Sequence, residues 1–180
     1  MNRFIRTTKR LLHEVHWLRT YQAALRALEG QQSYGLDFFR VAFTALIGDR
    51  AIRLIRVFED SKRVSSFWYL HRCEPKLIEE LLRSTGVRIS DLRDLSKWLK
   101  RPRDKTAVHI DRDYVFDPAE VWKGVGIKAE KVQQAIEALW FVLNELYQER
   151  AGSPFPHDEY TGEDILRLIE LRDMDIGEEQ

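Results

Sequence analysis

Apolar side chains recur at the spacing of one helix face along almost the whole chain, and this periodicity is the strongest constraint on its fold. Leu11, Val15 and Leu18 mark one such stripe near the N-terminus, and Ile136 and Leu139 belong to another near residue 140. No stretch of alternating apolar and polar residues competes as a strand. The sequence therefore predicts an all-α protein, an irregular bundle of about five main helices plus short extra ones.

The chain divides into a bundle at 1–152 and a C-terminal part at 153–180, which is either in the same domain or an appendage. The C-terminal part comprises a linker, a short helix at about 161–173 and an acidic end. Residues 33–60 are the most apolar segment and are expected to form the central helix. The other expected helices cover 5–29, 66–84 with a break at Glu74-Pro75, a segment capped by Ser90, a short one capped by Asp117, and 128–150.

Composition narrows the protein class. The 180 residues are 44% apolar and 32% charged, and the single cysteine, Cys73, allows no internal disulfide, so a reducing cytoplasm is expected. No Cys/His cluster has the spacing of metal ligands, and we expect neither a metal site nor a cofactor. No apolar run approaches the ~20 residues that span a bilayer, so no membrane association is expected.

The segment from Arg103 to His109 carries the residues best suited to chemistry. An arginine can neutralise a phosphate, and a histidine with an unperturbed pKa of about 6.5 can move a proton near neutral pH. Together they are sufficient for cleavage of RNA without a metal. The 2′-hydroxyl needs a base, and the pentacoordinate transition state needs positive charge.

Spacing alone does not single out this segment. What distinguishes it is Asp104, a small polar residue directly after the arginine, which could fix the geometry of Arg103 or His109. Arginine is followed at similar spacing by histidine at Arg6/His13, Arg10/His16 and Arg150/His157.

The sequence Arg103-Asp104-Lys105-Thr106-Ala107-Val108-His109-Ile110-Asp111 resembles the HEPN superfamily, most closely its abortive-infection AbiU-like branch. A weaker likeness is the stretch 53–60 followed by 64–70, and the resemblance covers roughly residues 10–150. Asp111 stands where the nucleotidyltransferase-paired HEPN toxins have a tyrosine. The resemblance implies a helical homodimer that acts as a metal-independent endoribonuclease, a toxin or phage-defence effector with RNA as its substrate and a possible antitoxin as its partner.

Helix geometry is compatible with such a homodimer. Arg103 and His109 lie about 120° apart around a helix and about 9 Å apart along it, so one chain alone is poorly placed to hold a single phosphate with both. A two-fold axis that brings two copies of the segment together would form a composite site. In that site His109 acts as general acid or base, Arg103 stabilises the transition state and Asp104 orients one of them. The residues expected to hold substrate phosphates are Lys105, Arg101 and Arg112.

Pro102, directly before the segment, either kinks a continuing helix, which we favour, or starts a new one.

Charge is unevenly distributed although the net charge is zero. Residues 88–112 hold eight basic and four acidic residues, and residues 158–180 hold nine acidic and two basic ones. These stretches are either solvated helix faces, or an RNA groove and an acidic end that gates it or contacts a partner.

Two other functions remain open: a catalytically inactive dimeric scaffold and a nucleotide-binding regulator. His13 and His16 are expected to be structural, and the arginines at 50, 53 and 56 either form an ion-paired or solvated stripe or face the catalytic groove.

Overall fold

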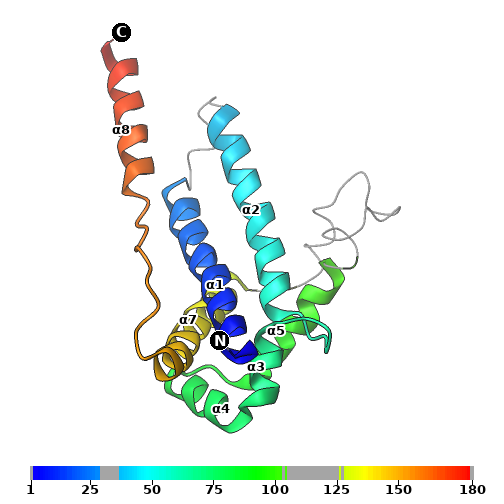
Figure 1. Cartoon of the computed structure of the whole chain (residues 1–180). Coiled ribbons are helices and arrows are strands. Elements are labelled where there is room, and N and C mark those ends of the chain that lie inside the picture. Colours follow the sequence, from blue (N-terminus) through cyan, green and yellow to red (C-terminus); the bar gives the residue numbers. More distant parts are fainter. Residues whose placement is uncertain (1, 29–36, 103, 105–125, 127, 179–180) are drawn as a thin grey trace.

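The computed structural model describes residues 2–28, 37–102, 104, 126 and 128–178, with the backbone alone described at 37–40, 101–102 and 171–178. Within these ranges the chain forms seven helices and no strand, which confirms the all-α prediction. None of the described helices is long and apolar enough to cross a membrane. The helices are α1 (Arg3–Ala27), α2 (Asp37–Phe58), α3 (Phe67–Cys73), α4 (Pro75–Ser84), α5 (Ile89–Pro102), α7 (Ala129–Ala151) and α8 (Glu163–Glu178) (Figure 1).

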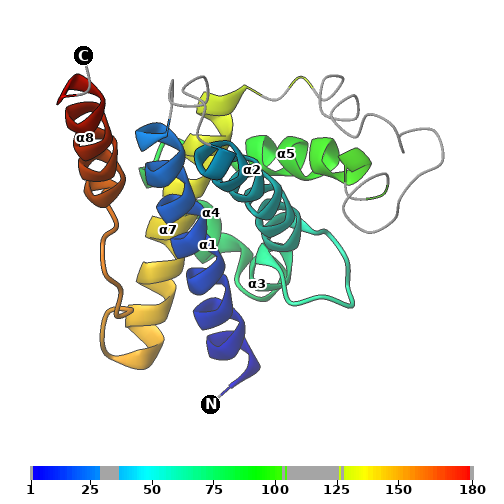
Figure 2. The same cartoon turned by 90° about the horizontal axis from the view of Figure 1, so that it is seen from above.

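Helix α1 occupies the centre of the bundle, where it packs along both α2 and α7 (Figures 1 and 2). The short helices α3 and α4 follow one another at the lower end of Figure 1; α3 contacts α1 and α4 contacts α7. Helix α5 packs against α2, on the flank opposite α8 in both views. Helix α5 also contacts α3 through the Trp68–Ser96 hydrogen bond, and its Arg93, Lys97 and Lys100 side chains are exposed.

The main core lies between α1 and α7 and continues to the C-terminal end of α2. The apolar stripes predicted from the sequence provide its side chains. Leu12 and Leu18 on α1 and Ile136 and Leu139 on α7 are fully buried. Burying one such side chain contributes roughly 2 kcal/mol. Phe58, near the end of α2, is buried in this core. It therefore holds the end of α2 in place beside α5.

The expectation that residues 33–60 form the central helix is wrong. Only the C-terminal half of α2 is buried in the main core, whereas Val41 and Ile47 in its N-terminal half are 62% and 47% exposed. The central position belongs to α1, which is covered on two sides. Apolar composition shows that a helix can be buried but does not show which neighbours are present to cover it.

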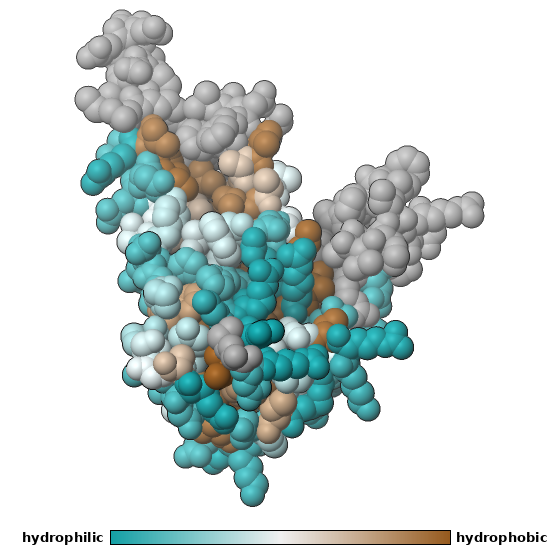
Figure 3. Space-filling view, in the orientation of Figure 1, coloured by the Kyte–Doolittle hydropathy of each residue, from teal (hydrophilic) through white to brown (hydrophobic). Residues whose placement is uncertain are grey.

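Helix α8 is reached by an extended segment, residues 152–162, that we call the strap. Phe155 anchors the strap in the main core with 3% of its surface exposed. At its far end, Ile165 and Ile169 of α8 form a small apolar cluster with Leu28 and with Phe43 and Leu46 of α2. In Figure 3, brown apolar side chains are visible on α8 and on the upper part of α2.

Gly162 connects the strap to α8 at a close approach to α1. Its φ angle is +82°, in the region that favours glycine, and a Cβ atom there would lie 3.2 Å from both the Ala23 carbonyl oxygen and the Ala27 Cβ. The first turn of α8 is therefore seated directly on the last turns of α1.

Candidate active site

The predicted site residues fall mostly outside the part of the chain that the structure describes. Arg103, Lys105, His109 and Arg112 lie there, as does the short helix expected at Asp117. Arg101 is described only as backbone, in the last turn of α5, and Asp104 is exposed. The structure therefore does not test whether these side chains come together. It does describe α5, the helix that leads into them.

Helix α5 has an apolar face and a basic face. Leu92, Leu95 and Leu99 are at most 3% exposed and attach the helix to the bundle. Pro102 is the last residue of α5 and does not begin a new helix. The continuation beyond Pro102 lies outside the described residues, so the kink stays a prediction.

The residue that precedes the first turn of α5 is Arg88 and not, as expected, Ser90, which lies inside the helix. The Arg88 carbonyl oxygen accepts the first helical hydrogen bonds, from the backbone N–H groups of Asp91 and Leu92. In return, the Asp91 carboxylate accepts a 3.1 Å bond from the Arg88 backbone N–H, which is one of the two bonds of a capping box. Hydrogen bonds from Arg88 lower the pKa of Asp91, so the cap is charged at neutral pH.

An open cleft of about 650 Å³ lies between α5 and the C-terminal end of α2. Ile55, Phe58 and Leu99 form its apolar part. Its α5 wall carries positive charge at helical spacing, and the turn after α2 contributes acidic and polar groups at the other side. The charged and polar lining residues are Arg93, Ser96, Lys97, Lys100, Glu59, Asp60 and Ser61.

Trp68 of α3 fixes the shape of this cleft. Its indole Nε1 donates to the Phe58 carbonyl oxygen at 3.0 Å and to Ser96 Oγ at 2.8 Å, which ties the end of α2 to the middle of α5. Ser96 Oγ donates in turn to the Leu92 carbonyl oxygen. The Arg93 guanidinium lies over the Trp68 ring, 5.7 Å from its centroid. The basic wall is therefore held in place by the hydrogen bonds of a buried tryptophan.

Positive charge on the α5 wall is only partly neutralised. Lys97 Nζ pairs with Asp94 at 2.9 Å on the solvent side. Across the cleft, Asp60 pairs with Arg72 at 3.0 Å. Among the described residues no carboxylate pairs with Arg93 or Lys100. These two cations can therefore attract an anionic chain along the wall.

Two clusters were expected to be structural or ion-paired, and the described contacts of His13, His16 and Arg53 agree. His13 packs edge-on against Phe155, and His16 lies near Trp140 and His157. No group of three metal-binding side chains occurs in the described part of the chain. Arg53 pairs with Glu14 and with Asp49, both at 2.7 Å, so it belongs to the contact between α1 and α2 and does not face the cleft.

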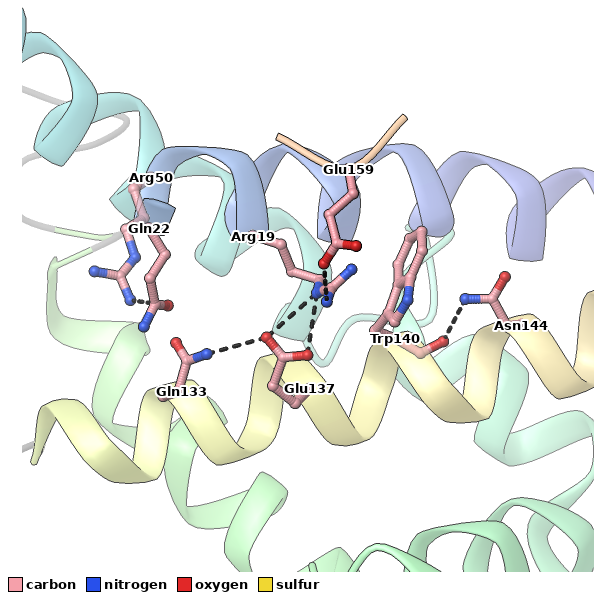
Figure 4. Close-up of polar contacts among 8 residues, drawn as sticks. All are labelled: Arg19, Gln22, Arg50, Gln133, Glu137, Trp140, Asn144 and Glu159. Carbon is pink, nitrogen blue, oxygen red and sulfur yellow. Dashed lines mark hydrogen bonds and ion pairs between the residues drawn. The ribbon is translucent and has the colours of Figure 1, made fainter. Parts of the chain in front are cut away.

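Sequence reasoning missed a polar network that runs between α1, α2 and α7 (Figure 4). Arg19 of α1 pairs with Glu137 of α7 at 3.0 Å and with Glu159 of the strap at 4.0 Å. Gln133 Nε2 donates to Glu137 at 3.0 Å. At the other end of the picture, Arg50 Nη2 donates to Gln22 Oε1 at 3.2 Å. We call this set of residues the α1–α7 network. Its partners lie far apart in the sequence, so no local pattern could have indicated it.

The chain matches a known protein family over most of its length. The HEPN family described as AbiU2 matches residues 1–171. No curated protein and no solved structure matches the chain.

Proposed function

Because the chain belongs to the HEPN family AbiU2 over nearly its whole length, we propose that it is a metal-independent endoribonuclease that acts as a toxin or phage-defence effector. The structural observation that carries this proposal is the basic wall of α5. Arg93, Lys97 and Lys100 follow one face of the helix that leads into the Arg103–His109 segment, and they line an open cleft. An RNA backbone along this wall would be directed toward the proposed catalytic residues.

In the proposed reaction, an imidazole of His109 takes the proton of the RNA 2′-hydroxyl, and the 2′-oxygen attacks the adjacent phosphorus. The bond from phosphorus to the 5′-oxygen breaks, and that oxygen receives a proton. The products are a 2′,3′-cyclic phosphate and a 5′-hydroxyl. Arg103 stabilises the charge of the pentacoordinate transition state, Asp104 orients one of the two groups, and Lys105, Arg101 and Arg112 hold phosphates.

A homodimer is part of this proposal. Helix geometry separates Arg103 from His109 within one chain, so the composite site uses groups from two copies. Among the described helices, α8 lies on the flank of the bundle opposite α5, so it does not compete with a second copy for the exposed face of α5 (Figures 1 and 2). For the same reason, the described part of the acidic end does not cover α5 within one chain. Its expected contact with a partner stays a prediction.

The test is incubation of the protein with total RNA in the presence of EDTA. Wild type should cleave, and His109→Ala and Arg103→Ala should each lower the rate by at least about 100-fold, the usual range for loss of a general acid–base group. His157→Ala is the matched control, because His157 also follows an arginine at similar spacing and should leave cleavage intact. Product ends are read by phosphatase and kinase labelling.

Cleavage that requires a metal, or that survives both substitutions, would rule out this mechanism. A harmless wild-type protein on expression, with no RNA cleavage, would favour the scaffold. Thermal stabilisation by nucleotides without cleavage would favour the nucleotide-binding regulator.

A further inference from the structure

The exposed side of the N-terminal half of α2 carries apolar and small residues and no charge. Val41 is 62% exposed, and Ala45 and Gly48 are exposed as well. No charged residue occurs between Arg40 and Asp49 in the sequence. The open face of a helix normally carries charged side chains, so an uncharged face of this kind indicates a surface that another molecule covers.

Four residues on this side of α2 repeat at the spacing of a coiled-coil seam. They are Val41, Ala45, Gly48 and Ile52, four, three and four positions apart, and we call them the α2 seam. At 100° per residue they fall within about 60° of one another around the helix. Ile52 is half-buried, and the next position of the repeat, Ile55, lines the cleft between α2 and α5. The α2 seam therefore continues the wall of that cleft toward the N-terminus of α2.

The fold of one chain does not explain Gly48. A glycine inside a helix costs about 1 kcal/mol relative to alanine. The φ angle of Gly48 is not positive, and a Cβ atom built on it would meet no atom within 4 Å. Neither the backbone conformation nor a neighbouring side chain therefore requires a glycine at this position. A second backbone that approaches α2 closely from outside would require it.

The α2 seam is complementary to itself. Its residues run large, small, small, large, so two copies of the seam can pack with small residues opposite small ones. In an antiparallel pair, Val41 of one copy lies opposite Ile52 of the other, and Ala45 lies opposite Gly48. The two backbones approach most closely at the small residues, and the large side chains fill the space at both ends.

The position of α5 favours the antiparallel direction. Helix α5 packs beside the C-terminal end of α2, where Ile55 is only 6% exposed, and the N-terminal half of α2 rises above it (Figure 1). A parallel pair would bring the two α5 helices to the same level beside the seam. An antiparallel pair places each α5 beside the exposed half of the other copy's α2, so the two α5 helices do not compete for the same space.

We propose that a second copy of the chain docks on the α2 seam, with its own α2 antiparallel to the first. The inference rests on the homodimer of the proposed function and adds the surface that forms it. A two-fold axis passes between Ala45 and Gly48, and Asp49, which flanks the seam, faces the uncharged Ala42 of the other copy, so no like charges meet. Four residues do not bury the roughly 800 Å² per partner of a standard interface, so the contact continues onto the exposed face of α5.

Disulfide cross-linking measures the direction of pairing. All variants carry Cys73→Ser, because Cys73 is a free, exposed cysteine. Oxidation of a mixture of Val41→Cys and Ile52→Cys, after subunit exchange, should link the two different chains, which a tag on one of them distinguishes on a non-reducing gel. Either variant alone should not cross-link, because identical positions lie about 16 Å apart along an antiparallel pair. Val41→Cys mixed with Lys76→Cys, an exposed position on α4, is the control and should not cross-link.

Gly48→Glu provides a second measurement. The variant should fold, because its side chain has open space and glutamate favours a helix more than glycine does. It should raise the Kd of the dimer by at least about 100-fold, since it places an unpaired charge at the centre of the contact. Analytical ultracentrifugation measures the Kd, and Lys76→Glu, the matched control on α4, should keep the wild-type value.

The outcomes separate this interface from the nuclease. Cross-linking of Val41→Cys alone would show a parallel pair and overturn the proposal. A dimer that forms no cross-link and whose Kd is unchanged by Gly48→Glu would place the interface elsewhere, while RNA cleavage that depends on His109 would leave the proposed function standing. A wild type that stays monomeric would assign the α2 face to a different protein. The expected cross-link without any RNA cleavage would keep the interface and remove the nuclease.

Discussion

At the scale of single residues, Glu14 and Arg53 organise the contact between α1 and α2. The Glu14 side chain is only 4% exposed, accepts a hydrogen bond from Arg53 and forms an ion pair with Arg10. Arg53 also pairs with Asp49, and its guanidinium lies 5.6 Å from the centroid of the Trp17 ring. A buried carboxylate is tolerated only while its cations are present.

We expect Arg53→Ala to lower the free energy of unfolding by about 3 kcal/mol, because it leaves Glu14 buried with less compensating charge. Urea unfolding at neutral pH measures the change. Arg56→Ala, an exposed position on the same helix, is the control and should change stability by less than about 0.5 kcal/mol. Equal effects of the two substitutions would show that Glu14 does not depend on Arg53.

His16 should make stability depend on pH. Burial, followed by the charges of His157, Arg19 and His13, lowers the pKa of His16 below 6.5. The unfolded chain therefore takes up a proton at higher pH than the folded one. The contribution of His16 to the free energy of unfolding is complete above about pH 6.5 and is lost as the pH falls from there through the lowered pKa.

Replacement of His16 by glutamine should remove this contribution. Stability curves of wild type and His16→Gln, measured by urea unfolding between about pH 7 and pH 5, should diverge toward acid with the wild type losing more. Parallel curves would show that another group is responsible for any acid sensitivity.

At the scale of helices, the sequence predicts element positions well and their neighbours poorly. The break between α3 and α4 at Glu74-Pro75 is confirmed, because proline fits the first turn of a helix but not its interior. The Ser90 cap is wrong, because the first turn begins after Arg88 and Asp91 in that turn bonds the Arg88 backbone N–H; only backbone hydrogen bonds decide where the first turn begins. The exposed half of α2 was not foreseen, because periodicity does not reveal which surface is left uncovered.

The basic wall of α5 gives a prediction at this scale. With His109→Ala as background to prevent cleavage, replacing Arg93, Lys97 and Lys100 by glutamine should weaken binding of single-stranded RNA. The slope of log affinity against log salt should decrease by about 0.7 for each RNA phosphate that the protein no longer neutralises. Fluorescence anisotropy at several salt concentrations measures both quantities.

The matched control for the basic wall is replacement of Lys76 and Arg83 by glutamine. Both are exposed cations on α4, outside the cleft, and their removal should leave the salt dependence nearly unchanged. If the two sets of substitutions weaken binding equally, the wall is not a specific path for RNA.

At the scale of the whole molecule, the fold follows from helix stripes, whereas the polar contacts between distant elements do not. The Arg19–Glu137 pair joins residues 118 positions apart, and no local spacing distinguishes these two from other exposed charges. The Arg103–His109 segment was found by its chemistry and by its resemblance to a family. In the proposed composite site its geometry would depend on a second copy of the chain, which the sequence of one copy cannot position.

The composite site predicts complementation between inactive variants. Arg103→Ala and His109→Ala are each expected to be inactive, but a mixture that exchanges subunits should regain roughly a quarter of wild-type cleavage. The mixed dimer restores one pairing of an intact Arg103 with an intact His109 from opposite copies. Cleavage of a labelled RNA before and after mixing measures the gain.

Complementation has a clear negative outcome. If light scattering shows a dimer, subunit exchange is demonstrated and the mixture stays inactive, the two groups act within one chain. A monomer that cleaves RNA at full rate would contradict the composite site directly.

Gly162 has a consequence for how related chains can diverge. Its backbone lies against Ala23 and Ala27 of α1, so a Cβ atom there would require a strained backbone and a shift of a few tenths of an ångström between α8 and α1. A relative with a larger residue at this position is therefore expected to seat the first turn of its C-terminal helix farther from α1. A single substitution at this position should therefore be enough to change how the C-terminal helix docks on α1.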